Sequence, residues 1–113
     1  MIDIVSRYYV TRQGCADRDS AIEQAVRLGD ELRARFAAGT ILGFEAATLA
    51  TDDDYADEGL GFARARLVAA VGDGPLVWVN VTFAAPGPDG DGLEGLVERF
   101  DLHPVVMDPW GGD

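Results

Sequence analysis

The chain has 113 residues, a formal net charge of −11 and 48% hydrophobic residues. This length matches one domain, and this apolar fraction suffices for one compact core, so we expect one folded domain. Residues 1–51 hold seven acids and six arginines, whereas residues 52–113 hold thirteen acids and three arginines. Because phosphate binding requires clustered positive charge, this balance disfavours nucleic acid and anionic membranes as partners.

The N-terminus carries Asp3 where a signal peptide carries basic residues, and no apolar run approaches the roughly 20 residues that span a bilayer. We therefore expect a soluble, cytoplasmic protein. Cys15 is the single cysteine and His103 the single histidine, which excludes an internal disulfide and a zinc site of the Cys/His kind. We expect no cofactor and no bound metal.

The first two elements have clear patterns. Residues 2–11 alternate between two faces and are rich in β-branched and tyrosine side chains, which predicts a strand. Ser20 and Glu23 have the spacing of a capping box, which predicts a helix start, and Gly39 predicts its end. The apolar stripe predicted to face the core consists of Ile22, Val26, Gly29, Leu32 and Phe36. A glycine inside such a stripe predicts close approach to a sheet or a second helix.

Three runs follow that alternate with period two, at residues 40–51, 62–71 and 76–84, and we predict a meander of strands. In the middle run the alanines and Leu67 share one face, and Arg64 and Arg66 share the other. Residues 72–75, Gly-Asp-Gly-Pro, predict a tight hairpin to the third run. That third run has the most apolar face of the chain and predicts a central strand.

The remaining elements are a loop at residues 86–90, a short helix with Leu93, Leu96, Val97 and Phe100 on its apolar face, and an edge strand at 103–107 containing Pro104. Residues 1–107 then form a single α+β domain, and 108–113 form an irregular tail. The predicted order is β-α-β-β-β-α-β. It describes a mainly antiparallel sheet of four or five strands, covered by one long and one short helix, and resembles a variant of the ferredoxin-like plan.

Two acidic segments are candidate sites. Five carboxylates lie within residues 52–58, between two predicted strands: Asp52, Asp53, Asp54, Asp57 and Glu58. We interpret this segment as a solvated loop, with a partner-binding patch and a hard-cation site as alternatives. Residues 87–98 partly match a calcium-binding loop, with Asp89, Asp91 and Glu98 at ligand positions, but Gly87 stands where the first aspartate belongs.

Cys15 follows a strand and precedes a helix, where a helix N-terminus can lower a thiol pKa; the alternative is a small, semi-buried filler residue. Another candidate site is a set of residues beside the sheet that could bind a ligand. It comprises Tyr8, Tyr9, Arg64, Arg66 and His103. No glycine-rich phosphate loop and no marked pair of catalytic carboxylates is present, so we nominate no catalytic residue.

These observations predict a small acidic interaction or accessory module, such as a small subunit, a regulatory partner or an immunity-type inhibitor. It would dock on another protein or on a second copy through a sheet face or its acidic C-terminal half. The alternative is a small enzyme or ligand-binding protein with a pocket between helices and sheet. Either way, the sequence suggests more apolar face than the short second helix covers.

The acidic half also suggests a mimic of nucleic acid. If the 52–58 and 89–101 segments lay on one side of the fold, they would present a strip of carboxylates to a basic partner. Its members would be Asp52, Asp53, Asp54, Asp57, Glu58, Asp89, Asp91, Glu94, Glu98, Asp101 and Asp108. The alternative is that these acids only keep the protein soluble.

Overall fold

The computed structural model describes residues 4–84 and 93–106. Their secondary-structure elements, in chain order, are β1 (Ile4–Thr11), α1 (Arg18–Ala37), β2 (Gly43–Leu49), α2 (Asp52–Asp57), the short 3-10 helix η1 (Gly61–Ala63), α3 (Arg64–Val71), β3 (Leu76–Ala84), α4 (Glu94–Arg99) and β4 (His103–Val105). The four strands form one antiparallel sheet in the order β2-β3-β1-β4. This is an α+β fold, as predicted.

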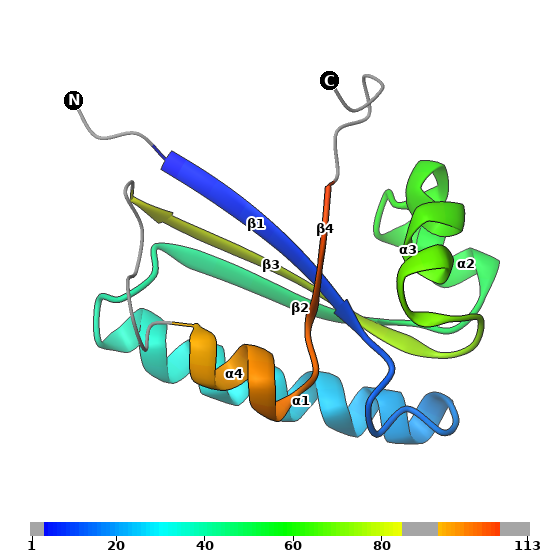
Figure 1. The fold of residues 1–113 in the computed structure, drawn as a ribbon, viewed down its shortest axis with the longest axis horizontal. Helices are drawn as coiled ribbons and strands as arrows, with labels where there is room; N and C mark the ends of the chain where they lie inside the picture. Colours follow the sequence, from blue (N-terminus) through cyan, green and yellow to red (C-terminus); the bar gives the residue numbers. More distant parts are fainter. Residues whose placement is uncertain (1–3, 85–92, 107–113) are drawn as a thin grey trace.

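The sheet separates two helical layers. Figure 1 shows α1 and α4 on one side of the sheet, and α2 and α3 on the other side towards one end. β3 lies between β2 and β1, in agreement with its prediction as a central strand. Its side chains alternate, so Val79 and Phe83 face α1 whereas Leu76 and Trp78 face α3. Each face therefore has its own apolar core.

The long helix begins earlier than predicted. Asp17, not Ser20, is its N-cap, and the Asp17 carboxylate accepts a hydrogen bond from the Ser20 N–H at 2.8 Å. Gly39 ends the helix as predicted, in the left-handed conformation (φ 82°) that suits a glycine after a C-terminus.

The predicted buried stripe of α1 is wrong for three of its members. Leu32 is buried as predicted, but the other buried apolar residues of the helix are Ala21 and Leu28. Ile22, Val26 and Phe36 are 42%, 58% and 50% exposed. The two stripes lie side by side around the helix, and the sheet covers only one of them.

The predicted strand at residues 62–71 is a helix. Ala63 and Leu67 are fully buried against the sheet and Val71 is half-buried, a four-residue spacing that fits one helix face. Alanine is the strongest helix former, so the small residues that we assigned to one strand face favour α3 instead. Consequently residues 72–75 join a helix to a strand and are not a hairpin, and Arg64 and Arg66 do not share a strand face.

The acidic run is also a helix, not a loop. Thr51 caps α2: its hydroxyl accepts from the Asp54 N–H at 3.2 Å, and the Asp54 carboxylate accepts from the Thr51 N–H at 3.1 Å. Aspartates in the first turn stabilise a helix, because its N-terminus is the positive end of the helix dipole. Thr51 followed three residues later by Asp54 is the sequence signature of this capping box, and it marks a helix start that our prediction of a loop missed.

The C-terminal elements agree with their predictions in part. The short helix is α4, whose Leu96 is buried beside Phe100, and the edge strand is shortened to β4. The Thr11 hydroxyl donates to the Phe100 carbonyl at 2.7 Å and joins the end of β1 to α4. The predicted loop at 86–90 and the 108–113 tail lie outside the described residues. Within the described residues, no helix is long and apolar enough to cross a membrane.

Candidate functional site

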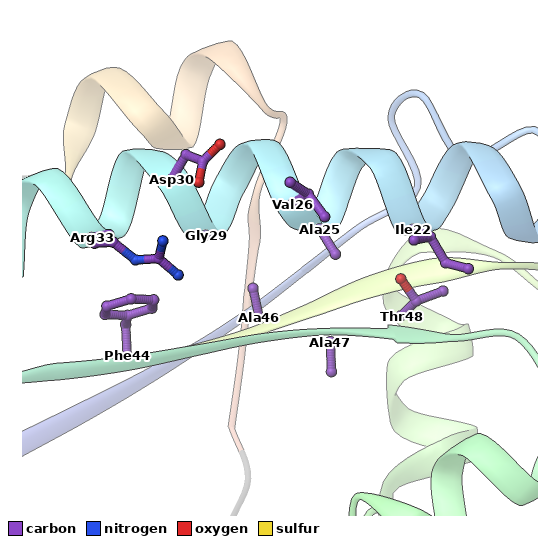
Figure 2. A pocket seen from close by; sticks show the side chains of 10 residues that line it. All are labelled: Ile22, Ala25, Val26, Gly29, Asp30, Arg33, Phe44, Ala46, Ala47 and Thr48. Carbon is purple, nitrogen blue, oxygen red and sulfur yellow. The ribbon is translucent and has the colours of Figure 1, made fainter.

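An open groove runs between α1 and the edge strand β2, with a volume of about 370 Å³. We call it the α1–β2 groove. Figure 2 shows Ile22 of α1 above Thr48 of β2, and Arg33 extending towards Phe44. The helix contributes Ile22, Ala25, Val26, Gly29, Asp30 and Arg33, and the strand contributes Phe44, Ala46, Ala47 and Thr48. The groove is therefore mainly apolar, with one acid and one base at its helical wall.

Small residues keep the groove open. Gly29 has no atom within 4 Å of the place where a Cβ would stand. Ala25 and Ala46, which line the same space, also lack the length to close it. The expected close approach at Gly29 is thus wrong within the described structure, because Gly29 faces the groove and not the packed sheet.

The strand wall of the groove is one edge of the sheet. β2 pairs only with β3 among the described strands, so its other side presents backbone groups that another chain can pair with. Exposed Ile22, Val26 and Phe36 follow α1 on the same side of the molecule. Exposed apolar side chains beside a free strand edge are typical of a surface that another protein covers.

The charged residues of α1 fall into two groups. Glu31 joins α1 to α4: its carboxylate contacts Arg99 at 2.9 Å and Arg35 at 3.5 Å. The hydrogen bond from Arg99 does most to lower the pKa of Glu31. By contrast, the i,i+4 spacing of Glu23 and Arg27 predicts an ion pair that does not form, and in the described part of the chain neither they nor Asp30 and Arg33 have a salt-bridge partner.

The structure does not bring the five predicted ligand residues into one pocket, and none of them lines the α1–β2 groove. Tyr8 stacks on Trp78, with ring centroids 5.3 Å apart, whereas the neighbouring Tyr9 is buried in the core on the opposite face. Adjacent residues of a strand point to opposite faces, so these two tyrosines cannot share a ligand.

The other predicted ligand residues have structural partners. Arg64 pairs with Asp52 at 3.0 Å and lies over the Tyr55 ring. Arg66 donates to the Val106 carbonyl at 2.7 Å and ties α3 to the end of β4.

His103 lies 3.3 Å from Asp101. It makes no hydrogen bond with Cys15, so the only thiol and the only imidazole of the chain do not form a nucleophilic pair in the described structure.

Cys15 is a buried core residue. Burial raises the pKa of its thiol, although Arg12 acts in the opposite direction. The thiol therefore stays protonated and unreactive near neutral pH, because the thiolate is the nucleophilic form. The filler interpretation of Cys15 is the better one.

The acids of α2 are partly used within the fold. Asp54 accepts hydrogen bonds from the Ala50 and Thr51 N–H groups and pairs with Arg18 at 3.2 Å. Burial opposes ionisation of Asp54, but these contacts outweigh it and lower the pKa. Among the described residues, no three His, Cys, Asp or Glu side chains converge as metal ligands do.

Glu58 lies at the C-terminal end of α2 and contacts the side chain of Glu45 on β2. The hydrogen bond to Glu45, then burial and the repulsion of Glu45, raise the pKa of Glu58. This contact places two acids close together next to the free edge of the sheet.

The single acidic strip is not formed by the described residues. α2 packs on one face of the sheet, through Tyr55, and α4 packs on the other face, through Leu96. Asp52, Asp53 and Asp57 are thus separated from Glu98 by the sheet. Asp89, Asp91 and Asp108, including the partial calcium-loop match, lie outside the described residues.

Comparison with known proteins adds no relative: no family model matches this chain, and neither curated proteins nor solved structures give a significant match.

Proposed function

We propose that the chain is a small acidic interaction or accessory module that works by docking on another protein chain. The observation that carries this proposal is the α1–β2 groove, where exposed Ile22 and Val26 lie beside a sheet edge that no described strand covers. Burying apolar side chains of this size contributes about 1.5–3 kcal/mol each when the burial is complete. Burial of Ile22 and Val26 therefore favours an interface centred on the groove.

The groove is better suited to docking than the surfaces expected from the sequence. Helices pack on both faces of the sheet, so a bare apolar sheet face is not what the protein presents. The acids of α2 are divided between helix capping, Arg18 and Arg64. Exposed carboxylates that remain, such as Asp53, contribute solubility and long-range repulsion of acidic partners.

The alternative of a small enzyme or ligand-binding protein has less support. An enclosed pocket buries most of a small molecule, whereas this groove is open and lined mainly by aliphatic side chains. The tyrosines, arginines and histidine that would have served a ligand are distributed over both faces of the sheet.

The strand order also supports an interpretation of the fold. We infer that the order β2-β3-β1-β4, with α1 and α4 on one face, is a ferredoxin-like arrangement in which α2 and α3 are inserted between β2 and β3. In this interpretation the insertion covers one end of the face that such a two-layer plan leaves open.

A matched pair of variants tests the function. Val26 and Phe62 are 58% and 57% exposed, but only Val26 lines the groove. We expect native mass spectrometry of the protein from its own host to show a protein complex for wild type and Phe62→Glu, and free chain for Val26→Glu. A free chain in wild type, or equal complexes in all three, would overturn the proposed docking through the groove.

A further inference from the structure

Building on the proposed function, we propose that the occupant of the α1–β2 groove is a second copy of this chain, with the two α1 helices packed antiparallel about Gly29 and the two β2 edges facing each other across the same twofold axis. The proposal rests on the spacing of the exposed stripe, on its charges and on the position of β2 beneath it.

The exposed stripe of α1 has the spacing of a helix-packing seam. Its residues are Ile22, Val26, Gly29, Arg33 and Phe36, separated by four, three, four and three positions. This is the a/d spacing by which two helices pack side by side. Gly29 is the midpoint, and Ile22 and Phe36 stand seven residues to either side of it. A twofold axis at Gly29 therefore sets Ile22 of one copy against Phe36 of the other.

The midpoint is also where two helices can approach most closely. Gly29 offers no side chain, and nothing occupies the space in front of it. Beneath it lies Ala46, the fourth of the seven residues of β2 (Gly43–Leu49). Figure 2 shows Gly29 and Ala46 between the pairs formed by Ile22 with Thr48 and by Arg33 with Phe44. One twofold axis that passes beside Gly29 and Ala46 therefore relates α1 to α1, and β2 to β2, of the second copy.

Charge complementarity selects a second copy over an unrelated chain. Glu23 and Arg33 lie on the exposed side of α1 and have no salt-bridge partner among the described residues. In the antiparallel pair, Glu23 of one copy and Arg33 of the other differ by only about 3 Å along the helix axis, at a rise of about 1.5 Å per residue. Twofold symmetry forms this ion pair twice.

The local charge supports the same occupant. The exposed charges of α1 beside the groove, Glu23, Arg27, Asp30 and Arg33, sum to zero, whereas Glu45 and Glu58 place two acids beside the β2 edge. On the helical wall of the groove a basic partner would gain no net attraction, and an acidic partner would be repelled by the rest of the molecule. A copy of the same surface pairs Glu23 with Arg33 twice, because an isologous interface brings the same residues of both copies together.

Charge-reversal variants test the arrangement by sedimentation equilibrium. Glu23→Arg sets a new arginine against Arg33 of the other copy, and Arg33→Glu sets a new glutamate against Glu23, twice in each homodimer. We expect wild type to dimerise and each variant alone to weaken the dimer at least tenfold. In an equimolar mixture of the two variants both ion pairs are restored across the interface, so we expect a heterodimer of near wild-type affinity.

Asp53→Arg, an exposed charge reversal on α2, is the matched control and leaves the dimer unchanged. A monomeric wild type, single variants that dimerise normally, or a mixture that stays monomeric would each overturn the second copy as occupant. A wild-type monomer that still holds a different protein, lost in Val26→Glu, would overturn this inference and leave the proposed function standing. A monomer without any bound protein would overturn both.

Discussion

At the scale of single residues, the start of α2 depends on two side chains. Thr51 and Asp54 satisfy each other's N–H groups, and Asp54 also accepts from Ala50. We predict that Thr51→Ala lowers the free energy of unfolding by about 1 kcal/mol, because a helix N-terminus loses its cap. Urea denaturation measures this loss, and Thr51→Ser, which keeps the hydroxyl, is the control. Equal stability of Thr51→Ala and wild type would contradict this role.

Asp54 also predicts a pH dependence. Its pKa is lowered in the folded protein, so its contribution to stability is present above the unfolded pKa of about 4 and is lost as pH falls through the folded value. We expect Asp54→Asn to be less stable than wild type at pH 7 and the difference to shrink below pH 4. Thermal unfolding at both pH values, with Asp53→Asn as control, measures it. A difference that grows on acidification would contradict the assignment.

For Glu58 we predict a pH dependence of stability opposite to that of Asp54. Its pKa is raised by Glu45, so the stability that its protonated form contributes is present at low pH and is lost as pH rises through the folded value. We expect Glu58→Gln to stabilise the protein at pH 7, by a few tenths of a kcal/mol because solvent screens these exposed acids, and by less at pH 4. Destabilisation by Glu58→Gln at pH 7, measured by urea denaturation, would show that the two acids do not repel each other in the folded state.

At the scale of elements, α1 contains a glycine that its own packing does not need. No atom lies within 4 Å of a Cβ built on Gly29, and glycine inside a helix costs about 1 kcal/mol relative to alanine. We predict that Gly29→Ala, introduced into the charge-reversed Glu23→Arg background, raises the free energy of unfolding by up to about 1 kcal/mol. Denaturant titration against Glu23→Arg alone provides the comparison. A loss of stability would mean that α1 packs closely on another part of the chain at this point.

At the scale of the whole molecule, the sheet separates two cores that share its strands. Leu28 of α1 and Leu67 of α3 are fully buried, one on each face of the sheet. We predict that Leu28→Ala and Leu67→Ala each cost about 2–5 kcal/mol, and that unfolding remains a single transition because both cores need the same sheet. Calorimetry checks both points. Two separate transitions in either variant would show that the two faces unfold independently.

The sequence by itself determined the elements whose pattern fits only one structure. The alternation of β1, the strongly apolar face of β3, the glycine that ends α1 and the apolar spacing of α4 all point to a sheet of antiparallel strands with helices, and the structure agrees. At residues 62–71 the pattern was ambiguous, because residues four apart, such as Ala63, Leu67 and Val71, share a face in a strand and also in a helix. Tertiary packing decided for the helix, since Ala63 and Leu67 fill the space over the sheet.

The candidate site was decided by tertiary structure alone. α1 carries two adjacent apolar stripes, and the sequence could not say which one the sheet would cover. Burial of Leu28 and Leu32 left Ile22, Val26 and Phe36 exposed, and the strand order left β2 at an edge beside them. These three residues, which we predicted to face the core, instead form a surface that another chain can cover, because a helix on a sheet buries only one of its faces.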